Sequence, residues 1–313
     1  MGYGSREAAT PMNDVALPGI RGEIRSLGAA VQGRPYLALA ALPLVFFGVF
    51  LVYPLALMFL VSIRNYAPAQ IVGDRLTLEN YLRFLLDPFY RRILLSTLRL
   101  AAVVSAAALL LAYPLAYYLS RTTSRVKGWL IFLLLTPLMV GIVVRTYGWI
   151  VLLGRNGTVN QLLLALGLVQ EPVRILFTET AVVLGLIEIL LPYMIFPLIS
   201  ALQKVDPTLE AAAASLGAGP LEVLRRVVLP LSLPGIVSGT VIVFTLSAGA
   251  IVTPAVLGGP RTQTMGTLIY QLMTATLNWP FGSAVAFILL AFEAFPVFLF
   301  FAATARGRAG RGP

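Results

Sequence analysis

The amino-acid sequence predicts an all-α protein whose helices cross a membrane six times. Hydrophobic residues make up 58% of the 313 residues and charged residues only 12%, whereas about a quarter of the residues of a soluble domain are charged. The mean hydropathy is +0.88. One water-soluble core cannot bury this much apolar surface, so much of it must face lipid. The apolar residues also fall into six runs, each long enough for the roughly 20 residues of a membrane-spanning helix.

The six predicted spans each contain at most one charged residue. They are residues 37–63, 94–120, 128–153, 180–202, 232–257 and 283–305. Prolines inside these segments are compatible with spans, because neighbouring helices re-satisfy the carbonyls that proline leaves free. We expect residues 37–305 to form one transmembrane domain between two cytoplasmic tails, residues 1–36 and 306–313. The connection at 77–86 has the pattern of a short amphipathic helix.

The basic residues predict the orientation. An even number of spans places both termini on one side. With that side cytoplasmic, the tails and cytoplasmic loops hold 13 of the 23 Lys and Arg residues, in line with the positive-inside bias of membrane proteins. The net charge of +10 is then explained by residues that flank spans, and no nucleic-acid partner is expected.

Two residue types are missing from the sequence, and their absence narrows the function. There is no Cys and no His, so disulfides, thiolate metal sites and the commonest general base are excluded. No G-x-x-x-x-G-K-[ST] loop is present to hold nucleotide phosphates. We therefore expect a protein that is not an enzyme and that binds no cofactor or metal. A membrane enzyme would need a cluster of Asp, Glu, Lys, Ser or Tyr, and none stands out.

Residues 206–230, between the fourth and fifth spans, predict two short helices. Asp206 suits an N-cap and Pro207 the first helical position, while Gly217 suits a left-handed end. The second helix is expected to begin at Pro220 and to end at Leu229-Pro230. Composition alone leaves this segment open to two interpretations, an interfacial linker or a surface that docks a partner.

The spacing within this segment resembles a known motif. Ala211-Ala212-Ala213, Gly217 after three residues, and Val227-x-Leu229-Pro230 after nine more are similar to the cytoplasmic loop of type I ABC importer permeases. That motif begins with Glu, where this chain has Ala211, and the nearest acid is Glu210. The resemblance implies that the loop is a coupling helix docked in a cleft of the ATPase. The residues it assigns to coupling are Glu210, Ala211, Ala212, Gly217, Leu229 and Pro230.

Further segments resemble the first permease subunit of spermidine/putrescine importers. They are residues 78–81, 145–149, 253–260 and 277–282. This resemblance implies a multi-pass protein of the bacterial inner membrane that works with a second homologous permease, an ABC ATPase dimer and a periplasmic or extracellular solute-binding protein. ATP and Mg²⁺ would bind the ATPase. The solute would be a polyamine or related amine; an amino-acid derivative, an opine or a metal complex is the alternative.

The polar residues within the spans are candidates for the translocation path. Glu188 and Glu293 each lie near the middle of a span, where an isolated carboxylate is costly. In the fifth span Ser238, Thr245, Gly249 and Thr253 recur at helical spacing and predict one polar stripe. Structural alternatives exist: a hydrogen-bonded acid at a helix contact, or close helix packing through Gly235-x3-Gly239. We expect Arg145, near a span end, to snorkel to the interface.

An ion-driven secondary transporter is the remaining alternative. It predicts an inverted repeat with broken helices at matching positions in two halves. The sequence contains no such symmetry, and this class does not require the spacing from Gly217 to Pro230. Co-purification of an ATPase would separate the two classes.

Overall fold

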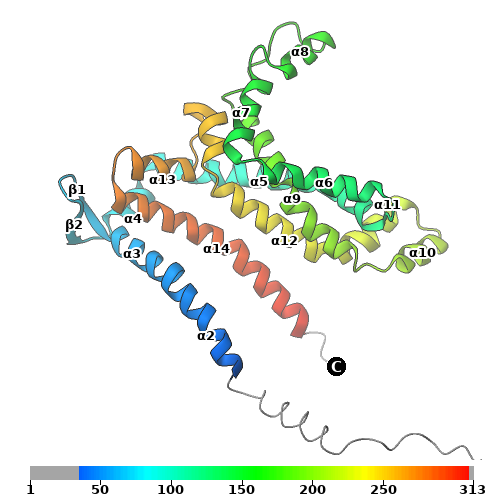
Figure 1. Cartoon of the computed structure of the whole chain (residues 1–313), viewed down its shortest axis with the longest axis horizontal. Coiled ribbons are helices and arrows are strands. Elements are labelled where there is room, and N and C mark those ends of the chain that lie inside the picture. The colour runs from blue at the N-terminus through cyan, green and yellow to red at the C-terminus, as the bar shows by residue number, and fades with distance from the viewer. Residues whose placement is uncertain (1–34, 310–313) are drawn as a thin grey trace, which may run out of the picture. The chain divides into compact units, whose positions relative to one another are not determined.

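Long apolar helices account for most of the chain (Figure 1). The computed structural model describes residues 35–309, with side chains for 41–260 and 262–298. The predicted N-terminal tail therefore lies almost wholly outside the described residues. The elements are α2 (Pro35–Phe47), η1 (Gly48–Val52), α3 (Tyr53–Ser62), β1 (Arg64–Ala67), β2 (Ile71–Leu76), α4 (Glu79–Leu86), α5 (Pro88–Arg121), α6 (Val126–Met139), α7 (Ile142–Leu153), α8 (Thr158–Ala165), α9 (Glu179–Leu202), α10 (Pro207–Ser215), α11 (Pro220–Val223), η2 (Leu224–Val228), α12 (Leu229–Ala248), η3 (Pro254–Gly258), η4 (Gly259–Arg261), α13 (Met265–Thr274) and α14 (Trp279–Ala309).

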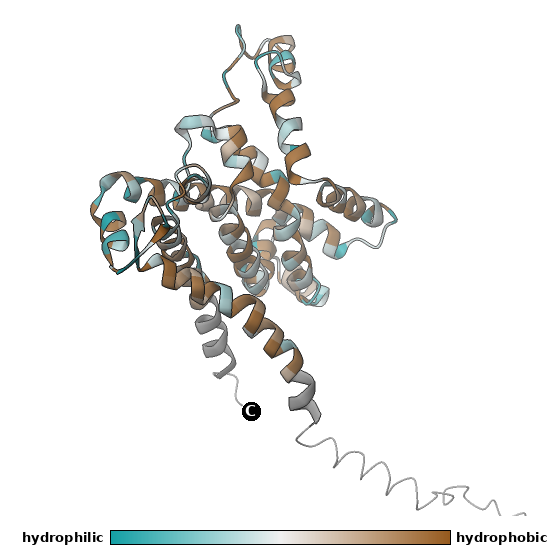
Figure 2. Ribbon diagram, turned by 60° about the vertical axis from the view of Figure 1, so that its left-hand side comes forward, coloured by the Kyte–Doolittle hydropathy of each residue, from teal (hydrophilic) through white to brown (hydrophobic). Residues whose placement is uncertain are grey.

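Five of the described helical segments are long and apolar enough to cross a membrane. They are Ala41–Ser62, Pro88–Arg121, Glu179–Leu202, Pro220–Ala248 and Trp279–Phe298. A sixth candidate consists of two helical segments, Val126–Met139 and Ile142–Ala165, bent by 101° at the break between them. Hydrophobic residues run along most of the helices, and hydrophilic residues gather in the connecting segments (Figure 2).

The chain divides into two units, residues 1–58 and 59–313. In the first unit, the described residues form an apolar helix that passes through η1, a π-helical turn. The Tyr53 N–H donates to the Gly48 carbonyl across this turn. Pro54 follows directly and has no N–H of its own, so the altered turn accommodates the proline without ending the helix.

In the second unit, α5, α9 and α12 pack against one another around a core of aliphatic side chains. Two glycines let α12 approach α9 closely. A Cβ on Gly235 would overlap the Ala201 methyl group and lie 2.8 Å from the Pro197 carbonyl oxygen. A Cβ on Gly239 would lie 2.8 Å from the Met194 sulfur. The close helix packing predicted for this Gly-x3-Gly pair is confirmed.

A second hydrophobic cluster joins α4, the start of α5, α13 and α14. Its centre is aromatic: Phe84 stacks on Tyr90, and Tyr90 meets the edge of Phe281. The helix predicted at 77–86 is confirmed as α4. The all-α prediction did not include the antiparallel hairpin of β1 and β2, in which the Asn65 side chain accepts a hydrogen bond from the Arg75 N–H (3.0 Å).

The structure corrects three predicted helices. The span predicted at 128–153 is broken: α6 ends at Met139, Val140 is extended, and α7 begins at Ile142. The span predicted at 232–257 ends at Ala248, and the chain turns before η3. The helix predicted to end at Leu229-Pro230 instead continues into α12.

The continuity of this last helix depends on η2. Its π turn places the Leu229 N–H on the Leu224 carbonyl, five residues back. The next residue, Pro230, has no N–H to leave unpaired. The candidate span therefore extends from Pro220 to Ala248 without a break.

We predict that Gly235→Val destabilises the α9–α12 contact. The new side chain would overlap Ala201 and force the helices apart, at a cost of about 1–3 kcal/mol or more for an overpacked core. Thermal unfolding of the detergent-solubilised protein should occur at a clearly lower temperature. Gly128→Ala is the matched control, since a Cβ there meets no atom within 4 Å. Equal melting temperatures for Gly235→Val and the wild type would contradict this packing.

Candidate coupling surface and translocation site

Helix α10 is stabilised by specific hydrogen bonds at each of its two ends. The Asp206 carboxylate accepts a hydrogen bond from the Thr208 backbone N–H (2.9 Å), which lowers the pKa of Asp206 below its ordinary value and keeps the cap ionised near neutral pH. At the other end, Gly217 has φ +90°. The N–H groups of Gly217 and Ala218 bond the carbonyls of Ala214 and Ala213, the Schellman pattern. The predicted cap and left-handed end are both confirmed.

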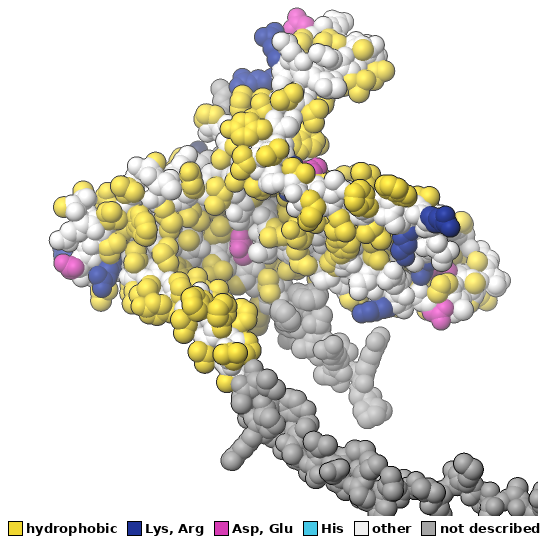
Figure 3. Space-filling model, viewed as in Figure 1, with side chains coloured by type: hydrophobic (Ala, Val, Ile, Leu, Met, Phe, Trp, Pro, Cys, Tyr) yellow, Lys and Arg dark blue, Asp and Glu magenta, His cyan; other side chains and the backbone are white. Residues whose placement is uncertain are grey.

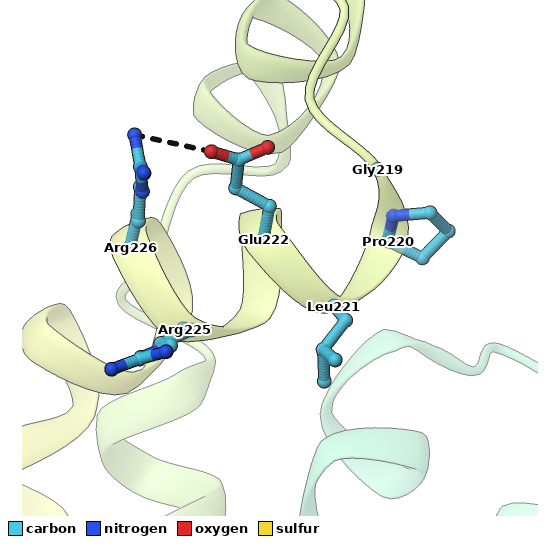
Figure 4. A pocket seen from close by; sticks show the side chains of 6 residues that line it. All are labelled: Gly219, Pro220, Leu221, Glu222, Arg225 and Arg226. Atoms are coloured by element: carbon cyan, nitrogen blue, oxygen red, sulfur yellow. Dashed lines mark ion pairs between the residues drawn. The ribbon is translucent and has the colours of Figure 1, made fainter.

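The surface around α10 and α11 is exposed and partly hollow. Ala211 and Ala212 are exposed, and Leu216 is 89% exposed. A hollow of about 420 Å³ lies between Gly219 and Arg226 (Figure 4), where Glu222 and Arg226 form an ion pair of 3.1 Å. A Cβ on Gly217 would meet no atom within 4 Å, so backbone conformation, and not packing within this chain, requires the glycine there.

Glu210 faces the bundle and not this exposed surface. Its carboxylate accepts a hydrogen bond from the Tyr117 hydroxyl (2.7 Å) and pairs with the Arg121 guanidinium. The side chains of Glu210 and Arg121 are only 17% and 21% exposed. Within this chain the partners of Glu210 belong to α5, and its predicted part in coupling stays a prediction.

Arg121 connects three segments that lie far apart in the sequence. Besides pairing with Glu210, its Nη1 donates to the carbonyl of Val205 (2.9 Å) and more weakly to that of Leu202 (3.3 Å). Leu202 is the last residue of α9, where helix carbonyls have no partner within the helix. We call Arg121, Glu210 and Tyr117 the coupling clamp. No local pattern in the sequence indicates this cluster, since Arg121 resembles any basic residue at the end of a span.

Leu229 and Pro230 lie in the first turn of α12. They follow η2 and are not part of α10. The spacing from Gly217 to Pro230 therefore combines two kinds of feature: the turn around Gly217, and the π turn that admits Pro230 into a continuous helix.

Within the spans, Arg145 and Glu188 form an ion pair. Arg145 Nη1 of α7 lies 3.6 Å from Glu188 Oε1 of α9. The Arg145 side chain is 13% exposed, so the prediction that it snorkels to the interface is wrong. Glu188 already has a basic partner in this chain, and its predicted contact with the solute stays a prediction.

The four residues predicted as one polar stripe do not all lie on one helix. Ser238 lies on α12 beside a hollow of about 420 Å³ between α9 and α12. Thr245 lies near the end of α12, which Gly249 caps. Thr253 lies beyond the break, is 1% exposed and packs against Gly185. The predicted stripe is interrupted before Thr253, because the helix ends at Ala248, and its role in a translocation path stays a prediction.

Glu293 of α14 lies beside the end of α12. A Cβ on Gly249 would be 3.5 Å from Glu293 Oε1. This carboxylate oxygen is buried, and it has no hydrogen-bond partner among the described residues. The Thr245 hydroxyl, one turn before Gly249, is also buried without a partner. Among the described residues, no group of three or more acidic residues is arranged to hold a metal ion.

Comparison with known proteins decides the family. The profile of the family described as "Binding-protein-dependent transport system inner membrane component" matches residues 24–307. The chain belongs to this family. It is 38% identical over 221 residues to the spermidine/putrescine transport system permease protein PotB of Escherichia coli (strain K12), covering 71% of this chain and 80% of PotB. With PotB of Haemophilus influenzae (strain ATCC 51907 / DSM 11121 / KW20 / Rd) it shares 35% identity over 254 residues, 81% of this chain and 88% of that protein.

The fold also matches a solved transporter. A chain of the bacterial alginate ABC transporter, crystallised with an alginate-bound periplasmic protein, superposes with a TM-score of 0.66. The match covers 87% of this chain and 95% of that chain at 18% identity, so the likeness concerns the fold. The chain is a multi-pass inner-membrane permease of the ABC importer class, and the predicted fold class and family are confirmed.

We predict that Glu210→Gln loosens α10 without unfolding the bundle. The substitution removes the charge that Arg121 pairs with, and a hydrogen bond to a charged group contributes about 1.5–3 kcal/mol. Amide hydrogens of α10 should exchange about 10–100 times faster, while those of α9 and α12 keep their protection. Glu222→Gln is the matched control, because its partner Arg226 is largely exposed. Unchanged exchange in α10 would show that the clamp does not hold this helix.

Proposed function

We propose that this permease forms, with a second homologous permease, the membrane path of an importer for polyamines or related amines. The observation that carries the proposal is the 35–38% identity, over most of the chain, to two permeases named for spermidine and putrescine. A path for such solutes also suits a chain with an acid inside its spans, since an ammonium group is attracted to a carboxylate.

The energy for transport would come from a separate ABC ATPase dimer, which binds ATP and Mg²⁺. This chain would bind no cofactor, and a solute-binding protein would deliver the solute. The exposed residues from Ala211 to Leu216 would dock in the ATPase. The coupling clamp supports this role, because Arg121 ties α10 to the ends of α5 and α9. A displacement of α10 would therefore move two bundle helices directly, and alternating access would follow.

Uptake by the reconstituted importer tests the proposal. Proteoliposomes that hold both permeases and the ATPase, with the binding protein supplied, should accumulate radiolabelled putrescine or spermidine in an ATP-dependent, saturable manner. Each amine should compete with the other, and neutral amino-acid derivatives, opines and metal chelates should not compete. If the importer takes up one of those other solutes in an ATP-dependent manner and takes up neither amine, the assignment to the importer class stands and the amine assignment is refuted.

The proposed orientation places both termini and α10 in the cytoplasm. Basic side chains support it, since several of them gather near α10 and α11 (Figure 3). The β1–β2 hairpin would then face the opposite side, towards the binding protein.

Because the natural chain has no Cys, single cysteines can test this orientation cleanly. Leu76→Cys, at a position 71% exposed in β2, should react with an impermeant maleimide in intact spheroplasts. Thr123→Cys, in the exposed connection between α5 and α6, should react only after lysis. The reverse pattern would invert the proposed topology.

A further inference from the structure

The acids of the candidate spans differ in whether they have a basic partner. Four acids lie within the described spans: Glu179, Glu188, Glu222 and Glu293. Glu179 pairs with Arg99 at 2.5 Å, and Glu222 pairs with Arg226. Glu188 pairs with Arg145 inside the bundle. Among the described residues, only Glu293 of the four has no Lys or Arg within 4.0 Å.

The surroundings of Glu293 leave room beside its carboxylate. Gly249, the C-cap of α12, lies beside it, and a Cβ on this glycine would be 3.5 Å from Oε1. The Thr245 hydroxyl adds a second buried polar atom without a described hydrogen-bond partner. Buried polar atoms normally have partners, so these two atoms, on helices that contact each other, leave hydrogen-bonding capacity that is open to a ligand.

The chemistry of the two groups defines that ligand. An ionised carboxylate only accepts hydrogen bonds, and a hydroxyl accepts as well as donates. A primary ammonium group offers three N–H donors and a positive charge. It would therefore satisfy both atoms and offset the cost of a charge inside the span. A neutral or anionic solute offers no such compensation.

We propose that Glu293, with Thr245 beside Gly249, is the point in the membrane at which an ammonium group of the solute binds during passage. At Glu188 the positive charge beside the carboxylate already comes from Arg145. Glu188 therefore supports the bundle, and Glu293 binds the solute. This inference rests on the proposed amine transport and adds to it a specific contact residue. A single carboxylate holds the cation weakly enough for release, as a transport path requires.

The first test compares Glu293→Gln with the wild type in the reconstituted importer. Loss of a charge-assisted hydrogen bond should lower kcat/KM for putrescine uptake by about 10–100-fold. Co-purification of the ATPase and basal ATP hydrolysis should persist. Glu293→Asp, which keeps the charge, should retain more uptake than Glu293→Gln. If the wild type takes up amines and Glu293→Gln does so at the same rate, this inference is overturned and the proposed function stands. If the wild type takes up no amine, the proposed function itself is refuted.

A second test uses the wild-type complex, so it does not depend on how a variant folds. The apolar reagent dicyclohexylcarbodiimide adds to carboxyl groups within membranes, and mass spectrometry of peptides locates the adduct. Glu293 should be modified, and millimolar spermidine should protect it. Glu188, held by Arg145, should show no such protection. Equal modification of Glu293 with and without spermidine, or no modification at all, would overturn the inference.

Discussion

A charged side chain inside an apolar span needs a partner, and this constraint explains most of the polar architecture of the permease. In hydrocarbon an unpaired ion is costly, so Arg145 and Glu188 meet across α7 and α9. The same requirement applies where α10 meets the bundle, since Glu210 and Arg121 are both largely buried. Glu293 has no basic partner in the described chain, and this exception indicates where a cationic solute can replace one.

The coupling clamp extends this logic to energy conversion. A docking helix that merely lay on the membrane surface could move without moving the bundle. In the proposed coupling role, Arg121 would prevent this, because it holds Glu210 of α10 together with the carbonyls of Leu202 and Val205 at and just after the end of α9. The continuous helix from Pro220 to Ala248 supplies a second connection. Motion of the partner ATPase would thus reach α5, α9 and α12, the helices that form the core.

Sequence reasoning succeeded where one local signal decides the outcome. Hydropathy located the spans, and the Asp206 cap and Gly217 turn predicted α10. It failed where the structure depends on a break in the backbone helix or on a contact between residues far apart in the sequence. The break at Val140 and the π turn before Pro230 are changes in the path of the backbone, and residue spacing alone does not reveal them. The pairing of Arg121 with Glu210 joins residues 89 positions apart, and no local pattern carries it.

The most direct measurement of the central claim is a cryo-EM map of the complete importer, trapped with spermidine inside the membrane. An amine nitrogen should lie at hydrogen-bonding distance from the Glu293 carboxylate, about 2.7–3.0 Å, with Arg145 still on Glu188. Density for spermidine at Glu188, with Arg145 displaced and Glu293 paired to another protein group, would contradict the account.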